Sequence, residues 1–227
     1  MKDRYGREID YLRISITDRC NLRCVYCMPE DGIYQISHKE ILTYDEIKRV
    51  CQCVTTLGIH KIKLTGGEPL TRKNCSELVA MIKALPGIEK VTLTTNGVLL
   101  KDQLKDLAEA GIDNINISLD NLSKTEFHRI TRREGLSSVL ESIEEALKYP
   151  QIGLKINCVP VVEDPENLVT IAGLAKKYPI HVRFIEMMPI GFGKDFVFRG
   201  EDEICSILER AYGIMIPDVN RYGNGPC

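Results

Sequence analysis

The chain alternates between short strand-like runs and longer stretches with helical periodicity. Such alternation predicts βα units, because parallel strands need helical crossovers between them. Thr43, followed by Glu46 three residues later, is a candidate helix start, and Gly58 and Gly111 are candidate stops. The fold class is therefore α/β, as an open doubly wound sheet or a partial barrel. We expect strands at 11–16, 61–65, 90–95, 114–119, 154–159 and 182–187, and helices at 43–57, 74–85, 101–110, 137–148 and 165–177.

The predicted strands are polar on one face. One face carries Asn114, Asn116, Ser118 and Asp120, and the other carries Ile115, Ile117 and Leu119. An ordinary eight-stranded barrel fills its interior with branched apolar residues instead. We therefore favour a splayed, parallel (β/α)6 partial barrel of the incomplete TIM type, with a polar ligand inside; one solvated sheet face is the alternative. The same face of the other strands carries Arg13, Ser15, Lys61, Lys63, Thr92, Thr94, Lys155 and Asn157.

Three cysteines lie close together in the segment CNLRCVYC at 20–27. They follow the first predicted strand, at the end where parallel α/β folds place their sites. A structural zinc site needs four ligands, whereas no second CxxC exists and the four histidines are isolated. Three thiolates without a fourth suggest a cubane iron–sulfur cluster with one open iron. We expect small apolar core positions for the other cysteines, Cys51, Cys53, Cys75, Cys158, Cys205 and Cys227.

Length and charge exclude several classes of protein. With 227 residues the chain can bury a sizeable core, and we expect a single domain over 1–227. The formal net charge of −2 gives no field that would recruit nucleic acid. No apolar run approaches the ~20 residues of a membrane span, and the N-terminus does not resemble a signal peptide. Nine cysteines without a secretion signal favour a reducing, cytoplasmic location.

The spacing CxxxCxxC, with Tyr26 before the last cysteine, resembles the radical S-adenosylmethionine (SAM) superfamily. The segment TGGEP at 65–69, after the second predicted strand, is similar to that superfamily's GGE motif. The resemblance implies a 4Fe–4S cluster on Cys20, Cys24 and Cys27, whose open iron chelates SAM. An electron from the cluster would split SAM into methionine and a 5′-deoxyadenosyl radical. No protein side chain is then expected to be a catalytic residue.

Longer segments resemble one family, the GTP 3′,8-cyclases of molybdenum cofactor biosynthesis. The resemblance implies a radical SAM lyase that converts GTP to (8S)-3′,8-cyclo-7,8-dihydroguanosine 5′-triphosphate. The radical would take the ribose 3′ hydrogen, and the resulting carbon radical would attack C8 of guanine. The segments, in chain order, are LRISITDRCNLRCVYCMPEDG, KIKLTGGEPLTRK, LTTNG, NISLD and RFIEMMP.

The family resemblance implies two sets of ligand contacts. The positions for SAM are Tyr26, Gly67, Glu68, Ser118 and Met188. The positions for GTP are Arg13, Lys61, Lys63, Thr94 and Lys155, with Arg183 as a further candidate. The residues themselves agree, since cations on one strand face are the expected partners of a triphosphate.

One part of the family pattern is missing from this sequence. The resemblance implies a second cluster that binds guanine, held by three cysteines in a C-terminal extension, but the sequence ends at RYGNGPC. We therefore expect a truncated form of the family. Two alternatives stay open: another single-cluster radical SAM enzyme acting on a peptide or small molecule, and a non-catalytic metal-binding α/β module. A radical SAM enzyme of either kind needs an external electron donor, and a homodimer is left open.

Overall fold

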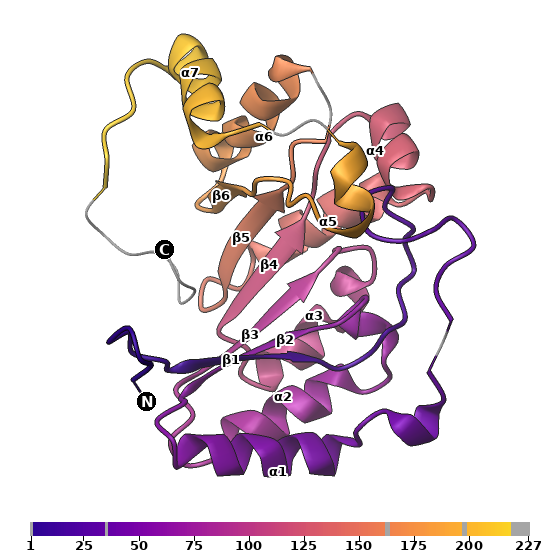
Figure 1. Cartoon of the computed structure of the whole chain (residues 1–227), viewed down its shortest axis with the longest axis vertical. Coiled ribbons are helices and arrows are strands. Elements are labelled where there is room, and N and C mark those ends of the chain that lie inside the picture. The colour runs from indigo at the N-terminus through magenta and orange to yellow at the C-terminus, as the bar shows by residue number, and fades with distance from the viewer. Residues whose placement is uncertain (1, 35, 162–163, 197–198, 219–227) are drawn as a thin grey trace.

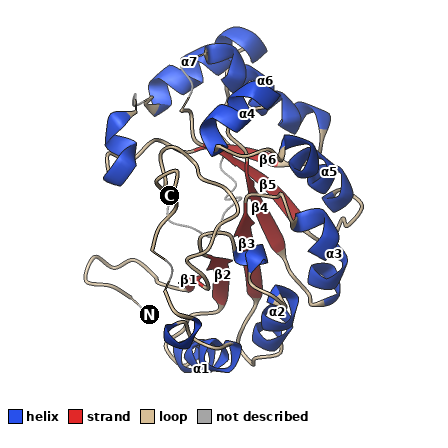
Figure 2. Cartoon of the chain, turned by 90° about the vertical axis from the view of Figure 1, so that its right-hand side faces the viewer, coloured by secondary structure: helices blue, strands red, loops and turns tan. Residues whose placement is uncertain are grey.

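The computed structural model describes residues 2–34, 36–161, 164–196 and 199–218. Its centre is one six-stranded sheet in which every neighbouring pair is parallel and the strand order follows the chain order. Figure 2 shows the helices as an outer arc around the strands. The predicted partial barrel is thus confirmed. The strands are β1 (Tyr11–Ser15), β2 (Lys61–Thr65), β3 (Lys90–Thr95), β4 (Asn114–Ser118), β5 (Gly153–Cys158) and β6 (His181–Phe184).

Seven α-helices are present in the described residues, and five of them were predicted. The predicted start of the first helix is confirmed, because Thr43 and Glu46 form a reciprocal capping box. The two helices that were not predicted are α4 and α7. The helices are α1 (Tyr44–Thr55), α2 (Cys75–Lys83), α3 (Leu100–Glu109), α4 (Lys124–Thr131), α5 (Leu136–Ala146), α6 (Pro165–Lys177) and α7 (Glu201–Tyr212).

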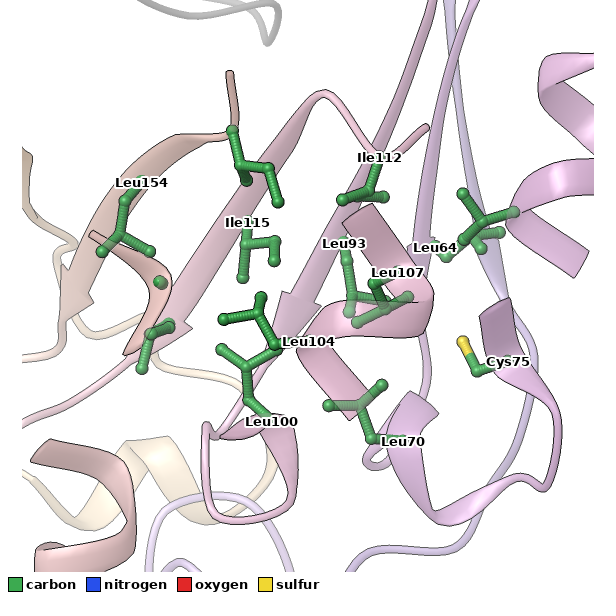
Figure 3. Close-up of a cluster of buried hydrophobic side chains, with 14 of the residues drawn as sticks. Leu64, Leu70, Cys75, Leu93, Leu100, Leu104, Leu107, Ile112, Ile115 and Leu154 are labelled. Carbon is green, nitrogen blue, oxygen red and sulfur yellow. The ribbon is translucent and has the colours of Figure 1, made fainter. Parts of the chain in front are cut away.

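The hydrophobic core lies between the sheet and the helices that cover its outer face. Leu64, Leu93 and Ile115 point outward from three neighbouring strands and are fully buried. Leu104 and Leu107 of α3 pack into the same cluster, as Figure 3 shows. Burying a side chain of this size stabilises the fold by roughly 1.5–3 kcal/mol. The apolar parity of the strands therefore fixes which face the helices cover.

The polar face of the sheet points to the inside of the open barrel. Thr92, Asn116 and Lys155 lie on its middle strands with only 6%, 5% and 9% of their surface exposed. A face open to bulk water would leave these side chains largely accessible. The alternative of a solvated sheet face is therefore wrong for the centre of the sheet.

The cysteines outside the 20–27 segment differ from one another. Cys51, Cys75 and Cys158 are buried, as expected. Cys53 is exposed, so its expected core position is wrong: two residues after buried Cys51, it lies on another face of α1. Cys205 is half-buried.

The expectations that rest on Cys227 and the segment before it concern residues 219–227, which lie outside the described residues. Within the described ranges, no helix has both the length and the apolar character needed to cross a membrane.

Candidate functional site

The loop after β1, which we call the cysteine loop (residues 16–28), is folded into tight turns. The backbone N–H groups of Cys27 and Met28 both donate to the carbonyl of Cys24, at 2.9 and 3.1 Å. The N–H of Leu22 donates to Sγ of Cys20 at 3.4 Å. Cys20 and Cys24 are half-buried, whereas Cys27 is exposed. All three predicted ligands therefore lie on one compact loop at the carboxyl end of β1.

The three thiols are electrostatic neighbours. Burial is the main cause that raises the pKa of Cys24, and the charges of Asp120, Cys20 and Cys27 raise it further. Burial is also the main cause that raises the pKa of Cys20 and of Cys27. These thiols are protonated at neutral pH when they bind nothing, so a bound metal would have to displace their protons.

The donor set, three cysteines on one loop, is one that an iron–sulfur cluster could use. Among the described residues, no group of three or more His, Cys, Asp or Glu side chains converges as ligands of one metal ion. A structural zinc site requires such convergence of four ligands. In a cubane cluster each thiolate binds a different iron, so neighbouring thiols on one loop suffice. Cys20, Cys24 and Cys27 are three such thiols on one loop, and their binding of a cluster stays a prediction.

The segment after β2 lies directly against the cysteine loop. The N–H of Gly67 donates to the carbonyl of Thr17 at 2.7 Å, and the N–H of Glu68 donates to the carbonyl of Arg19 at 2.7 Å. A Cβ added to Gly66 would lie 2.6 Å from the Thr17 carbonyl oxygen, and one added to Gly67 would overlap the Arg19 carbonyl. The paired glycines are therefore needed for this close approach of two backbones.

The Glu68 carboxylate is buried and is bound by this chain itself. One oxygen accepts from the Leu70 N–H at 3.0 Å and from the Thr95 hydroxyl at 2.7 Å. The other accepts from the Asn96 N–H at 2.6 Å. Burial raises the pKa of Glu68, and these hydrogen bonds oppose that rise. Glu68 thus ties the ends of β2 and β3 together, while its contact with SAM stays a prediction.

Asp120, just beyond β4, was not predicted as a site residue. Its Oδ2 accepts from the Tyr26 hydroxyl at 2.7 Å, and its Oδ1 accepts from the Val159 N–H at 2.8 Å. Burial raises the pKa of Asp120 to about 6, although both hydrogen bonds lower it. Asp120 therefore joins the cysteine loop to the end of β5. The signal in the sequence was its shared parity with Ser118, a half-buried residue at the end of β4.

Four cations form a group on the inner face of the barrel. We call this group the cation cluster; its members are Arg13, Lys63, Lys155 and Arg183. Arg13 of β1 lies opposite Lys63 of β2 in the sheet register. Burial lowers the pKa of Lys63 to about 8, and the charges of Arg13, Arg183 and Lys155 lower it further. Burial and Arg183 likewise lower the pKa of Lys155. Since β1 and β6 are the two ends of the sheet, its curvature brings Arg13 and Arg183 to one site.

Three other residues predicted to contact GTP or SAM lie in different parts of the structure. The ammonium group of Lys61 donates to Asp10 at 2.5 Å, so the structure does not bring it into the cation cluster. Thr94 is half-buried and lies opposite Asn116 in the sheet register. Met188 lies beyond β6 and is 66% exposed.

Helix α4 holds the far side of the cysteine loop. The N–H of Arg23 donates to the carbonyl of Thr131 at 2.9 Å, and the N–H of Val25 donates to the carbonyl of Ile130 at 2.9 Å. Figure 1 shows the indigo loop that follows β1 running beside α4. The cysteine loop is therefore fixed by three neighbours: the glycine segment after β2, Asp120 and α4.

Comparisons with known proteins agree with this geometry. The family described as "Radical SAM superfamily" matches residues 14–175. The GTP 3′,8-cyclase of Clostridium perfringens (strain SM101 / Type A) is 46% identical over 229 aligned positions, which cover 100% of this chain and 70% of the relative. The GTP 3′,8-cyclase of Syntrophomonas wolfei is 44% identical over 232 positions, which cover 100% of this chain and 71% of that relative.

A solved structure supports the fold. Streptococcus suis SuiB bound to S-adenosylmethionine superposes with a TM-score of 0.72 at 17% identity, over 89% of this chain and 46% of SuiB. At that identity the likeness concerns the fold alone. The family match and the curated relatives, taken with the three-cysteine loop and the GGE segment, show that the chain belongs to the GTP 3′,8-cyclase family of the radical SAM superfamily.

Proposed function

We propose that this chain acts as a radical SAM GTP 3′,8-cyclase, a lyase that converts GTP to (8S)-3′,8-cyclo-7,8-dihydroguanosine 5′-triphosphate. The observation that carries the proposal is that β1 positions both the cation cluster and the cysteine loop. Arg13 on the strand belongs to the cation cluster, and the cysteine loop begins directly after the strand. A substrate held by the cations would therefore lie inside the barrel, below the loop.

The proposed cofactors are a 4Fe–4S cluster and SAM. A cluster bound by Cys20, Cys24 and Cys27, with SAM on its open iron, would supply the electron that cleaves SAM. The chain's own task is to keep these thiols together and to exclude alternative loop shapes. For SAM we propose contacts with Tyr26, Gly67, Ser118 and Met188, and also with Glu68, whose carboxylate already accepts hydrogen bonds from this chain.

The cation cluster is the proposed binding site of the triphosphate. Arg13, Lys63 and Lys155 repel one another, as the lowered pKa of Lys63 indicates. A ligand with several negative charges removes that repulsion and gains charge-assisted hydrogen bonds. Arg183 and Thr94 are proposed to contribute to the same site, whereas Lys61 would first have to leave Asp10.

Calorimetry tests the substrate assignment. Lys63→Ala should weaken GTP binding by roughly ten- to a hundredfold, the value of one charge-assisted hydrogen bond, and should leave guanosine binding unchanged. Lys105→Ala, which removes an exposed lysine on α3, is the matched control and should change neither. An equal loss for GTP and guanosine in the Lys63 variant would show that this lysine does not bind phosphate.

The reaction itself can be followed by chromatography under anaerobic conditions. Protein reconstituted with iron and sulfide, then given SAM, reductant and GTP, should form 5′-deoxyadenosine, and cyclised GTP formed in step with it would support GTP as the substrate. Formation of 5′-deoxyadenosine with GTP unchanged would show that SAM cleavage is not coupled to GTP cyclisation in this chain. Failure of the wild-type chain to retain iron would favour a non-catalytic module.

The partners follow from this chemistry. We propose an external electron donor, because no step in GTP cyclisation supplies the electron that cleaves SAM. We also propose that the protein works in the cytoplasm, where thiols such as Cys20, Cys24 and Cys27 stay reduced.

A further inference from the structure

The C-terminal end of α4 is joined to the cysteine loop by hydrogen bonds from both backbone and side chains. Beside the two backbone hydrogen bonds from Arg23 and Val25, the guanidinium of Arg132 reaches across to the loop. Its Nη1 donates to the carbonyl of Arg23 at 3.2 Å and to the carbonyl of Met28 at 3.2 Å. These two carbonyls lie on either side of the segment that contains Cys24 and Cys27.

A second guanidinium binds the same loop from within. Nη1 of Arg23 donates to the carbonyl of Cys20 at 2.7 Å and to that of Leu22 at 2.8 Å. Arg23 and Arg132 together therefore satisfy four carbonyl groups of the cysteine loop. Buried carbonyls without such partners would have to turn toward water, and the loop would change shape.

The backbone of Arg132 is unusual. It lies in the left-handed region, with φ of 54°, and Asn74 is the only other non-glycine residue of the described ranges with positive φ. Its N–H donates to the carbonyl of His128 at 2.7 Å and so caps α4. Glycine makes that cap with less strain, because it has no Cβ. The cap alone therefore does not explain an arginine here, whereas the two loop carbonyls do.

We propose that Arg132 is a positioning residue that holds the cysteine loop in its cluster-binding shape before any metal arrives. The proposal rests on the proposed function only in taking Cys20, Cys24 and Cys27 as ligands. Loop order in the metal-free chain is a separate question, and it can be measured without the cluster. Helix α4 thus contributes to cofactor binding although it carries no ligand.

Hydrogen exchange of the metal-free protein tests the proposal directly. Arg132→Gly keeps the left-handed backbone and the helix cap but removes the guanidinium. Arg133→Ala is the matched control, because it removes the neighbouring exposed guanidinium, which donates to the carbonyl of Arg132 and not to the loop. We expect amide exchange in residues 20–28 to become roughly ten- to a hundredfold faster in the Arg132 variant, and to stay unchanged in the control.

A conservative variant separates charge from geometry. Lysine keeps the charge of Arg132, and its ammonium could also donate to both carbonyls, as the single Nη1 does here, but it sits on a flexible four-carbon stem instead of a rigid planar guanidinium. We therefore expect Arg132→Lys to restore only part of the slow exchange. Complete restoration by lysine would overturn the need for a rigid guanidinium at this position.

The reconstituted protein provides a second readout. Because a nearby cation favours the more negative, reduced state of a cluster, Arg132→Gly should shift the reduction potential to more negative values than Arg133→Ala does. Wild-type exchange in residues 20–28 of Arg132→Gly would overturn the proposal. A wild-type chain that binds no iron would contradict the proposed function instead, without altering the exchange result.

Discussion

Lys63 shows that the members of the cation cluster repel one another, which would favour binding of an anionic ligand. Its ammonium group lies among Arg13, Lys155 and Arg183, and burial together with these charges lowers its pKa to about 8. The unfolded chain then binds more protons than the folded one between about pH 8 and the ordinary lysine pKa of 10.5, so this residue makes stability rise with pH in that window. Near neutral pH the folded chain carries the repulsion that a triphosphate would relieve.

This titration predicts a pH dependence of GTP binding. Above pH 8 the chain must take up a proton at Lys63 to bind the triphosphate, so affinity should fall, by up to about tenfold per pH unit. Lys63→Arg, which stays charged, should flatten this part of the profile. Calorimetry from about pH 7 to 9, in buffers of different ionisation enthalpy, measures both affinity and proton uptake. A pH-independent affinity in the wild type would contradict the assignment.

Individual residues differed in how well the sequence revealed them. The placement of three cysteines on one loop and of cations on one strand face was predictable, because spacing and parity are local properties of the chain. The role of Asp120 was not, since its partners Tyr26 and Val159 lie far from it in sequence. Lys61 has the parity of a site residue, but a neighbouring carboxylate, Asp10, binds it.

At the scale of elements, the segment after β2 acts as a second support for the cysteine loop. Its backbone donates to the carbonyls of Thr17 and Arg19, and Glu68 joins it to the end of β3. The carboxylate is nearly inaccessible to water. An unsatisfied buried group costs about 1–3 kcal/mol, so these contacts specify the shape of the loop.

The close approach of the two backbones gives a prediction for Gly67→Ala. The new Cβ would overlap the Arg19 carbonyl, and the cysteine loop would have to move. We expect reduced iron content after reconstitution and a free energy of unfolding lowered by about 1–3 kcal/mol. Gly173→Ala in α6 is the control, because its Cβ would meet no backbone and only the Tyr212 hydroxyl, at 3.0 Å, far from the cysteine loop. Iron content and chemical denaturation measure the two effects; wild-type values for Gly67→Ala would contradict the steric argument.

The elements themselves were largely predictable from periodicity. The two missed helices have different reasons. Helix α4 is short, and its buried face rests on few apolar residues such as Phe127 and Ile130. Helix α7 does carry helical spacing in Ile204, Ile207 and Leu208, but it packs on Leu168 in a separate small cluster away from the main core.

At the scale of the whole molecule, the polar interior lowers the free energy of unfolding. Lys155 is almost fully buried and faces other cations, so its charge opposes folding. Lys155→Met should therefore raise the free energy of unfolding by about 1 kcal/mol, because it removes repulsion and the cost of burying a charge. The same change should weaken GTP binding roughly ten- to a hundredfold. Denaturant unfolding and calorimetry on one variant measure both; a less stable variant would show that Lys155 supports the fold.

The strand order has a consequence for how the molecule opens. Each of β1 and β6 has a single neighbour in the described sheet, whereas the four inner strands are paired on both sides. Edge segments are the first to detach in local fluctuations, at a cost below that of global unfolding. The cysteine loop follows one edge strand and Arg183 lies on the other. The two margins of the sheet can therefore fluctuate while the central strands stay paired, and both parts of the proposed site adjoin these margins.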